Sequence, residues 1–139
     1  MSGPATPRLA PETGTFITEL DAAVEAHMDW TRRILRCAVL RESPGEDVLA
    51  PRAHTLCRFG NWFASQRAHF DAVDAAAAQR AADVHREMHD SIRSICTDIV
   101  SGRAGQAEAL LGFERSQSEL LRVLAGFKTL ILSSAVRHD

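Results

Sequence analysis

Two histidines four residues apart, in the stretch VHREMH, are the first residues of this sequence whose types and spacing suit chemistry. On a helix, His85 and His89 project from one face, so both imidazoles can bind a single metal ion. The spacing alone is weak evidence, because six histidines in 139 residues give such a pair by chance in roughly a quarter of sequences. Arg86 stands where the HExxH metalloproteases carry their general base, so the stretch does not predict a peptidase.

The surroundings of this pair favour a metal site over two packed core residues. The helical stripe that holds His85 and His89 continues, at alternating spacings of three and four, through Ile92, Cys96 and Ile99. This periodicity predicts that both imidazoles face the core, where each needs partners for two ring nitrogens. His27 occupies a similar position on an earlier apolar stripe. A shared metal ion would give all three imidazoles a partner.

Cys57 is the thiol best placed to join these histidines. It lies in CRFGNW, near the predicted start of a short helix, where the pKa of a thiol is lowered and the thiolate is favoured. Cys37 and Cys96 lie within apolar helical stretches and are interpreted as buried structural thiols. His54 is a candidate ligand that ranks below the others. The two remaining histidines have no apolar stripe around them and are expected to be solvated: His69 and His138.

The elements that must position these residues are predicted to be the helices of one all-α domain. The chain has 139 residues, of which 45% are hydrophobic and 24% charged, and it contains no Tyr. This composition is typical of one globular domain. Prolines near the start predict a flexible N-terminal tail over residues 1–14, and the helical bundle domain is then expected over residues 15–137.

Apolar periodicity predicts three long helices and one short helix, arranged as an antiparallel, four-helix-bundle-like fold. The long helices are expected at about 15–40, 70–100 and 104–135, and the short one around 54–63. Pro44 and Pro51 bracket the clearest interior loop, and Gly102 suits a left-handed position just after a helix.

Charge and hydropathy exclude several classes of function. The formal charge of −2, with basic residues scattered among acidic ones, argues against a nucleic-acid-binding surface. No apolar run approaches the roughly 18 residues of a membrane-spanning helix. The lack of an apolar signal segment and the odd number of cysteines, three, predict a cytoplasmic location. A haem or di-iron bundle is a less favoured alternative, because the Glu-rich motifs of di-iron sites are missing.

Taken together, the motifs resemble those of the chemoreceptor zinc-binding domain family, usually called CZB. The matching stretches are AHMDW around His27, CRFGNW at Cys57, VHREMH at His85 to His89, and the turn SGRAGQAEALL. The resemblance covers about residues 15–135 and implies a helical, dimerising domain. It also implies that one zinc ion per chain is bound by His27, Cys57, His85 and His89.

Zinc is also the metal that this mixed set of donors favours. One thiolate and three imidazoles suit Zn²⁺, and four protein ligands leave no open position for catalysis. The occupied site would carry a net positive charge, so a carboxylate is expected to accept a hydrogen bond from a ligand histidine. The nearest carboxylates in the sequence are Glu25, Asp29, Asp83 and Asp90.

The resemblance implies a regulatory module rather than an enzyme. CZB domains are usually attached to chemotaxis receptors or diguanylate cyclases, where they sense zinc or oxidants, and redox sensing would act through Cys57. We therefore expect a homodimer without catalytic residues. Because no output domain is attached here, the module is expected to act in trans on a chemoreceptor or a diguanylate cyclase. A purely structural, zinc-stabilised dimerisation bundle is the alternative.

Overall fold

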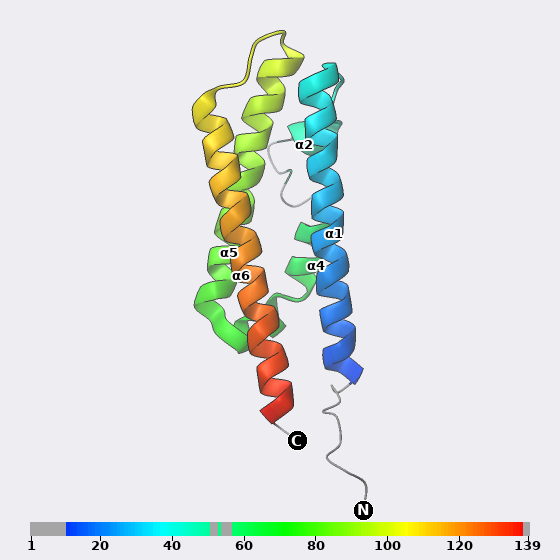
Figure 1. Ribbon diagram of the computed structural model, residues 1–139, viewed down its shortest axis with the longest axis vertical. Helices are drawn as coiled ribbons and strands as arrows, with labels where there is room; N and C mark the ends of the chain where they lie inside the picture. Colours follow the sequence, from blue (N-terminus) through cyan, green and yellow to red (C-terminus); the bar gives the residue numbers. More distant parts are fainter. Residues whose placement is uncertain (1–10, 51–52, 54–56, 138–139) are drawn as a thin grey trace, which may run out of the picture.

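The computed structural model describes residues 11–50, 53 and 57–137, and its elements are all helices, as predicted (Figure 1). In chain order they are α1 (Pro11–Leu40), α2 (Glu46–Leu49), α4 (Arg58–Ser65), α5 (Arg67–Val100) and α6 (Ala107–Arg137). Within these described ranges, no helix has a stretch that is both long and apolar enough to cross a bilayer.

The three long helices form the body of the molecule. α5 and α6 lie side by side as an antiparallel hairpin and share the most extensive contact between any two elements (Figure 1). α1 lies alongside this hairpin and runs in the same direction as α5. Between α1 and α5, the described part of the chain holds the short helices α2 and α4 in place of a full second bundle helix. Within this segment, α4 contacts both α1 and α5, so it links the two helices that carry the candidate histidines.

The first helix begins earlier than the sequence predicted. Residues 11–14, which the sequence assigned to the tail, belong to α1, while residues 1–10 lie outside the described part of the chain. Pro11 suits the first position of a helix, because the N–H that proline lacks has no intrahelical acceptor there. Glu12 adds a negative charge in the first turn, where the helix dipole favours it.

The predicted interior loop contains one helical turn, α2, and in this respect the prediction of a plain loop was wrong. The turn begins after Gly45, whose φ of 102° brings its carbonyl within 3.1 Å of the Val48 amide nitrogen. Val48 itself is completely buried. Burial of this apolar side chain stabilises the compact turn. The turn was not predicted because it shows no periodic pattern in the sequence.

α5 is bent near its start and capped at its end. Asp74 has an extended backbone (φ −163°, ψ 97°), and its carboxylate accepts a hydrogen bond from the Ala77 amide at 3.0 Å. Asp74 thereby caps the longer part of the helix, which holds both candidate histidines. At the far end, Gly102 has a φ of 81° and its amide donates to the carbonyl of Ile99, which confirms the predicted left-handed position.

The core follows the apolar stripes that the sequence predicted. Its largest fully buried side chains include Phe59, Phe70, Phe127, Leu20, Met88 and Ile92. Aromatic rings connect the elements: the ring centroids of Phe70 on α5 and Phe127 on α6 lie 4.9 Å apart. The buried positions of α5 are Phe70, Ala78, Ala81, Val84, His85, Met88, His89, Ile92 and Cys96. Both candidate histidines of α5 therefore face the core.

Candidate metal centre

His85 and His89 form a pair of imidazoles one helical turn apart on the buried face of α5. Their side chains are 4% and 1% exposed, respectively. The two Nε2 atoms lie 3.0 Å apart, and the rings are nearly perpendicular. The i, i+4 spacing brings the rings together, as the sequence predicted, because the helix alone fixes this part of the geometry.

Cys57 brings a sulfur atom to the same point from the start of α4. It is the N-cap of that helix, with extended dihedral angles (φ −80°, ψ 153°), and its Sγ accepts a hydrogen bond from the Gly60 amide at 3.1 Å. The same Sγ lies 3.3 Å from Nε2 of His85. A backbone N–H donor at a helix start favours a negatively charged sulfur, the form of cysteine that binds metals.

These three residues have the geometry of a metal site. Among the described residues, the ligand atoms of Cys57, His85 and His89 all lie within 4.8 Å of one another. In a zinc tetrahedron with bonds of about 2.0 Å to nitrogen and about 2.3 Å to sulfur, two nitrogens lie about 3.3 Å apart and a sulfur lies about 3.5 Å from a nitrogen. The observed separations of 3.0 and 3.3 Å are close to these values.

His27, the fourth predicted ligand, is buried beside this cluster but is not one of the three grouped residues. Its ring stacks on Trp30 at 5.8 Å between centroids, and Trp30 in turn contacts the ring of His89 at 4.4 Å. Phe59 makes the second link, at 6.4 Å from His27 and 4.9 Å from His85. Each of these two aromatic rings therefore lies near both His27 and a histidine of α5.

The surroundings of His27 disfavour the charged form of its ring. Burial lowers its pKa below the ordinary value, and a side-chain hydrogen bond with Gln117 of α6 acts in the opposite direction. The buried Nε2 atom of His27 has no hydrogen-bond partner among the residues that the structure describes. A neutral imidazole with an unpartnered buried nitrogen suits a metal ligand, because the metal supplies the missing interaction.

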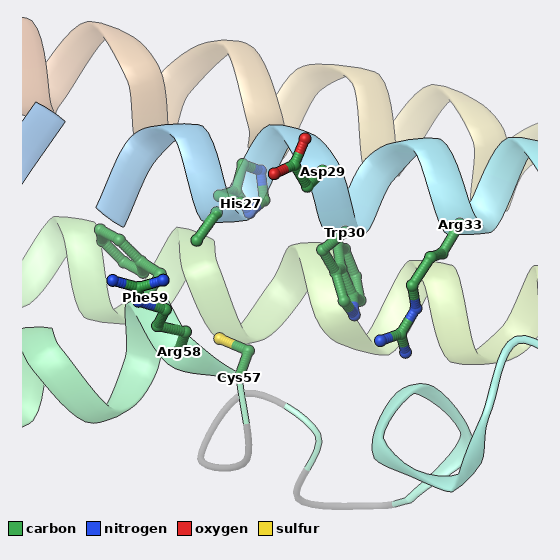
Figure 2. A pocket seen from close by; sticks show the side chains of 8 residues that line it. His27, Asp29, Trp30, Arg33, Cys57, Arg58 and Phe59 are labelled. Atoms are coloured by element: carbon green, nitrogen blue, oxygen red, sulfur yellow. The ribbon is translucent and has the colours of Figure 1, made fainter. Parts of the chain in front are cut away.

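A cavity of about 240 Å³ lies between α1 and the start of α4. Figure 2 shows that α1 contributes His27 and Trp30, while Cys57 and Phe59 come from the chain on the opposite side. The other lining residues are Ala26, Asp29, Arg33 and Arg58. The cavity therefore gives a small ion or molecule space beside both Cys57 and His27.

Three of the four carboxylates that the sequence suggested for the ligand histidines have surface partners instead. Asp29 pairs with Arg32, Asp83 accepts from Gln79 at 2.9 Å, and Asp90 lies 3.4 Å from Arg93. The fourth, Glu25, is exposed. The polar side chain of α6 that lies next to this part of α1 is instead Gln117, whose Oε1 is 3.3 Å from the Thr31 hydroxyl, and sequence reasoning missed it. The available signal was a glutamine within the apolar stripe of the last helix.

The other cysteines and histidines are placed as follows. Cys37 and Cys96 are buried, as interpreted from the sequence, and their thiols are neighbours. His69 is exposed, and its ring lies 4.2 Å from that of Phe16. The remaining two histidines lie outside the described residues: His54 and His138.

Comparisons with known proteins identify the family and the fold of this chain. Residues 27–96 match the chemoreceptor zinc-binding domain family, so the matched segment begins at His27 and includes Cys57, His85 and His89. The chain is also similar to a solved structure, the regulatory CZB domain of DgcZ, with a TM-score of 0.72 and 20% sequence identity. That likeness covers 86% of this chain and 98% of the other, and at this identity it shows the fold. No curated protein sequence matches the chain.

Proposed function

Because the chain belongs to the chemoreceptor zinc-binding domain family, we propose that it is a regulatory module that binds one zinc ion. The ligands in this proposal are His27, Cys57, His85 and His89. The observation that carries it is the convergence of one sulfur and two ring nitrogens within 4.8 Å, in a buried position. Three imidazoles and a thiolate match the preference of Zn²⁺, and four protein ligands leave no position for a substrate. We therefore assign no enzymatic activity.

The proposed ligands come from three separate parts of the fold. His27 lies on α1, Cys57 lies at the start of α4, and the other two ligands lie on α5. When bound, the ion supplies no reaction and instead cross-links these parts. A change in zinc occupancy then changes how firmly α1 and α4 are held against α5, which provides a signal that a partner protein can detect. We propose a chemoreceptor or a diguanylate cyclase as that partner, in the cytoplasm.

Metal analysis of the purified full chain tests the proposal, and we expect about one zinc per chain. His85→Ala and His89→Ala should each lose most of this zinc. Both should also unfold at a clearly lower temperature, because structural zinc binding in small peptides reaches about 10–16 kcal/mol, comparable to the whole stability of a domain.

His69→Ala is the matched control, because it removes an exposed histidine of the same helix. It should retain both the zinc and the melting temperature. Tightly bound zinc and an unchanged melting temperature in either α5 variant would show that the site has been assigned to the wrong residues.

A further inference from the structure

The cavity between α1 and the start of α4 is lined by hydrogen-bond donors that the proposed zinc site does not use. Its volume of about 240 Å³ gives room for a small molecule. Besides two of the proposed metal ligands, the lining includes Trp30, Arg33 and Arg58. These three side chains offer donors alone, because neither an indole nor a guanidinium has a hydrogen-bond acceptor.

Trp30 contributes a buried donor without an acceptor. The residue is 6% exposed, and its Nε1 has no hydrogen-bond partner among the described residues. Buried polar groups in folded proteins are nearly always hydrogen-bonded, so this nitrogen calls for an explanation. The second tryptophan has an ordinary partner, because Nε1 of Trp62 donates to Glu19 at 3.0 Å. Since Trp30 forms part of the cavity wall, a ligand in the cavity is a candidate acceptor.

The guanidinium of Arg33 brings a positive charge to the same end of the cavity. Figure 2 shows it turned toward the indole nitrogen of Trp30. One of its nitrogens donates to the carbonyl oxygen of Pro44 at 3.0 Å, which fixes the direction of the side chain. A guanidinium has five N–H donors in a planar fork, so it can bind Pro44 and a ligand at the same time. Two donors that face one another favour an acceptor between them.

The charge of the lining favours an anion. Arg58, exposed in the first turn of α4, adds a second guanidinium, and in Figure 2 Cys57 lies between it and Arg33. Among the described lining residues, Asp29 supplies a carboxylate, which is paired with Arg32. A small anion at this place therefore meets two positive charges, and the nearby negative charge is already neutralised.

We propose that this cavity binds a small carboxylate anion, held by the guanidinium of Arg33 and the indole N–H of Trp30. A carboxylate carries two acceptor oxygens in one plane, so it can serve both donors at once. Phe59 and Ala26 offer apolar surface to a short carbon chain. The inference goes beyond the proposed zinc site, because neither donor is a proposed metal ligand. The bound anion lies beside Cys57 and is a second input to this part of the molecule.

The two tryptophans of the full chain provide a direct readout. In proton–nitrogen NMR of the nitrogen-15-labelled protein as purified, each indole N–H gives one signal, and Trp62→Phe assigns them. Sodium propionate, added at constant ionic strength, should move the Trp30 proton signal downfield until it saturates, because this N–H gains an acceptor. The Trp62 signal should stay in place, since its acceptor is Glu19. Propionamide, which has the same shape without the charge, should bind at least about tenfold more weakly.

Two arginine variants test the source of the affinity. Arg33→Gln removes the charge and the fork, so propionate should bind at least about tenfold more weakly. Arg36→Gln is the matched control, because Arg36 is an exposed arginine of the same helix that pairs with Glu42 and is not among the described lining residues. Propionate affinity should change by less than about twofold in this control, because exposed charges at a distance are screened by salt.

A Trp30 signal without a saturable response to propionate overturns the inference. Equal affinities for propionate and propionamide, or equal affinities of the natural chain and Arg33→Gln for propionate, also overturn it. Phosphate is titrated in the same way, and phosphate that binds at least as tightly as propionate shows that the class of ligand is wrong. The indole signals report on the cavity whether or not the protein holds zinc, so failure of the proposed function does not affect this test.

Discussion

At the scale of single residues, the surroundings of the three cysteines differ sharply. Cys57 is partly exposed, lines a cavity, and accepts a backbone hydrogen bond that favours a negative sulfur. Cys37 and Cys96 are 1% and 0% exposed. Burial, followed by the neighbouring Cys37 thiol, raises the pKa of Cys96 to about 12. Because thiolates react with oxidants and thiols hardly do, we expect Cys57 to be the reactive cysteine.

The corresponding prediction is that peroxide releases zinc through Cys57. Transfer of one peroxide oxygen to the Cys57 sulfur forms a sulfenic acid and leaves water, and the oxidised sulfur is a poorer ligand. One equivalent of hydrogen peroxide should therefore free zinc, followed with a colorimetric chelator. Cys96→Ala should release zinc as fast as the natural chain, because Cys96 lies outside the proposed ligands. Equally fast release from Cys57→Asp would show that the switch lies elsewhere.

The residue scale also shows what a sequence can reveal of a site. The pairing of His85 with His89 was predictable, because one helix turn fixes it without help from the rest of the fold. The place of Cys57 beside these histidines was predictable from its motif and its position at a helix start. The contact of Thr31 on α1 with Gln117 on α6 was not, because it depends on how the two helices pack. Three of the four acids near the ligands in sequence instead pair with Arg or Gln side chains at the surface.

At the scale of the elements, the end of α5 depends on a residue without a side chain. Gly102 has a φ of 81°, a conformation that is strained for other residues, and no other atom would contact an added methyl group there. Gly102→Ala should therefore destabilise the metal-free protein by about 1 kcal/mol, measured by urea unfolding.

Gly126 is the matched control for this prediction. It lies inside α6, and a methyl group added there also meets no neighbour. Gly126→Ala should raise stability by up to about 1 kcal/mol, because alanine favours a helix over glycine. Two changes of the same sign would contradict the account, since the substitution is identical and only the backbone conformation differs.

Element boundaries were harder to predict than the elements themselves. The long helices were visible because their apolar residues repeat over many turns. The bend of α5 at Asp74 was not, because an aspartate in a helical pattern usually reads as an exposed surface residue. The helical turn around Val48 was not predicted for a related reason, because four residues are too few to show the helical repeat of apolar residues.

At the scale of the whole molecule, apolar side chains are exposed near one end of the bundle. α1 ends with Leu35, Val39 and Leu40 exposed, and Leu110 and Leu111 are exposed near the start of α6. Figure 1 shows that these two helix ends lie at the same end of the molecule. An apolar surface of this kind is typical of an interface, and a two-fold dimer would bury it on both copies.

We therefore predict a homodimer in which α1 and α6 contribute to the interface. Light scattering at micromolar concentration should give twice the mass of one chain. Val39→Glu combined with Leu111→Glu should shift the protein toward the monomer, because each dimer would bury four added charges. Ala75→Glu, an exposed position of α5 far from this end, should leave the mass unchanged. A monomeric mass for the natural chain would rule out the dimer.

The parallel course of α1 and α5 has a consequence for the synthesis of the protein on the ribosome. α1 is made first, with Leu20, Ala23 and Trp30 on the face that the finished protein buries. The hairpin of α5 and α6, against which α1 lies, is complete only when Arg137 has been added. At about 5–20 residues per second, the wait lasts roughly 5 to 20 s. During that time the nascent α1 exposes an apolar face of the kind that chaperones recognise. Synthesis is therefore the stage at which this protein is most prone to aggregation.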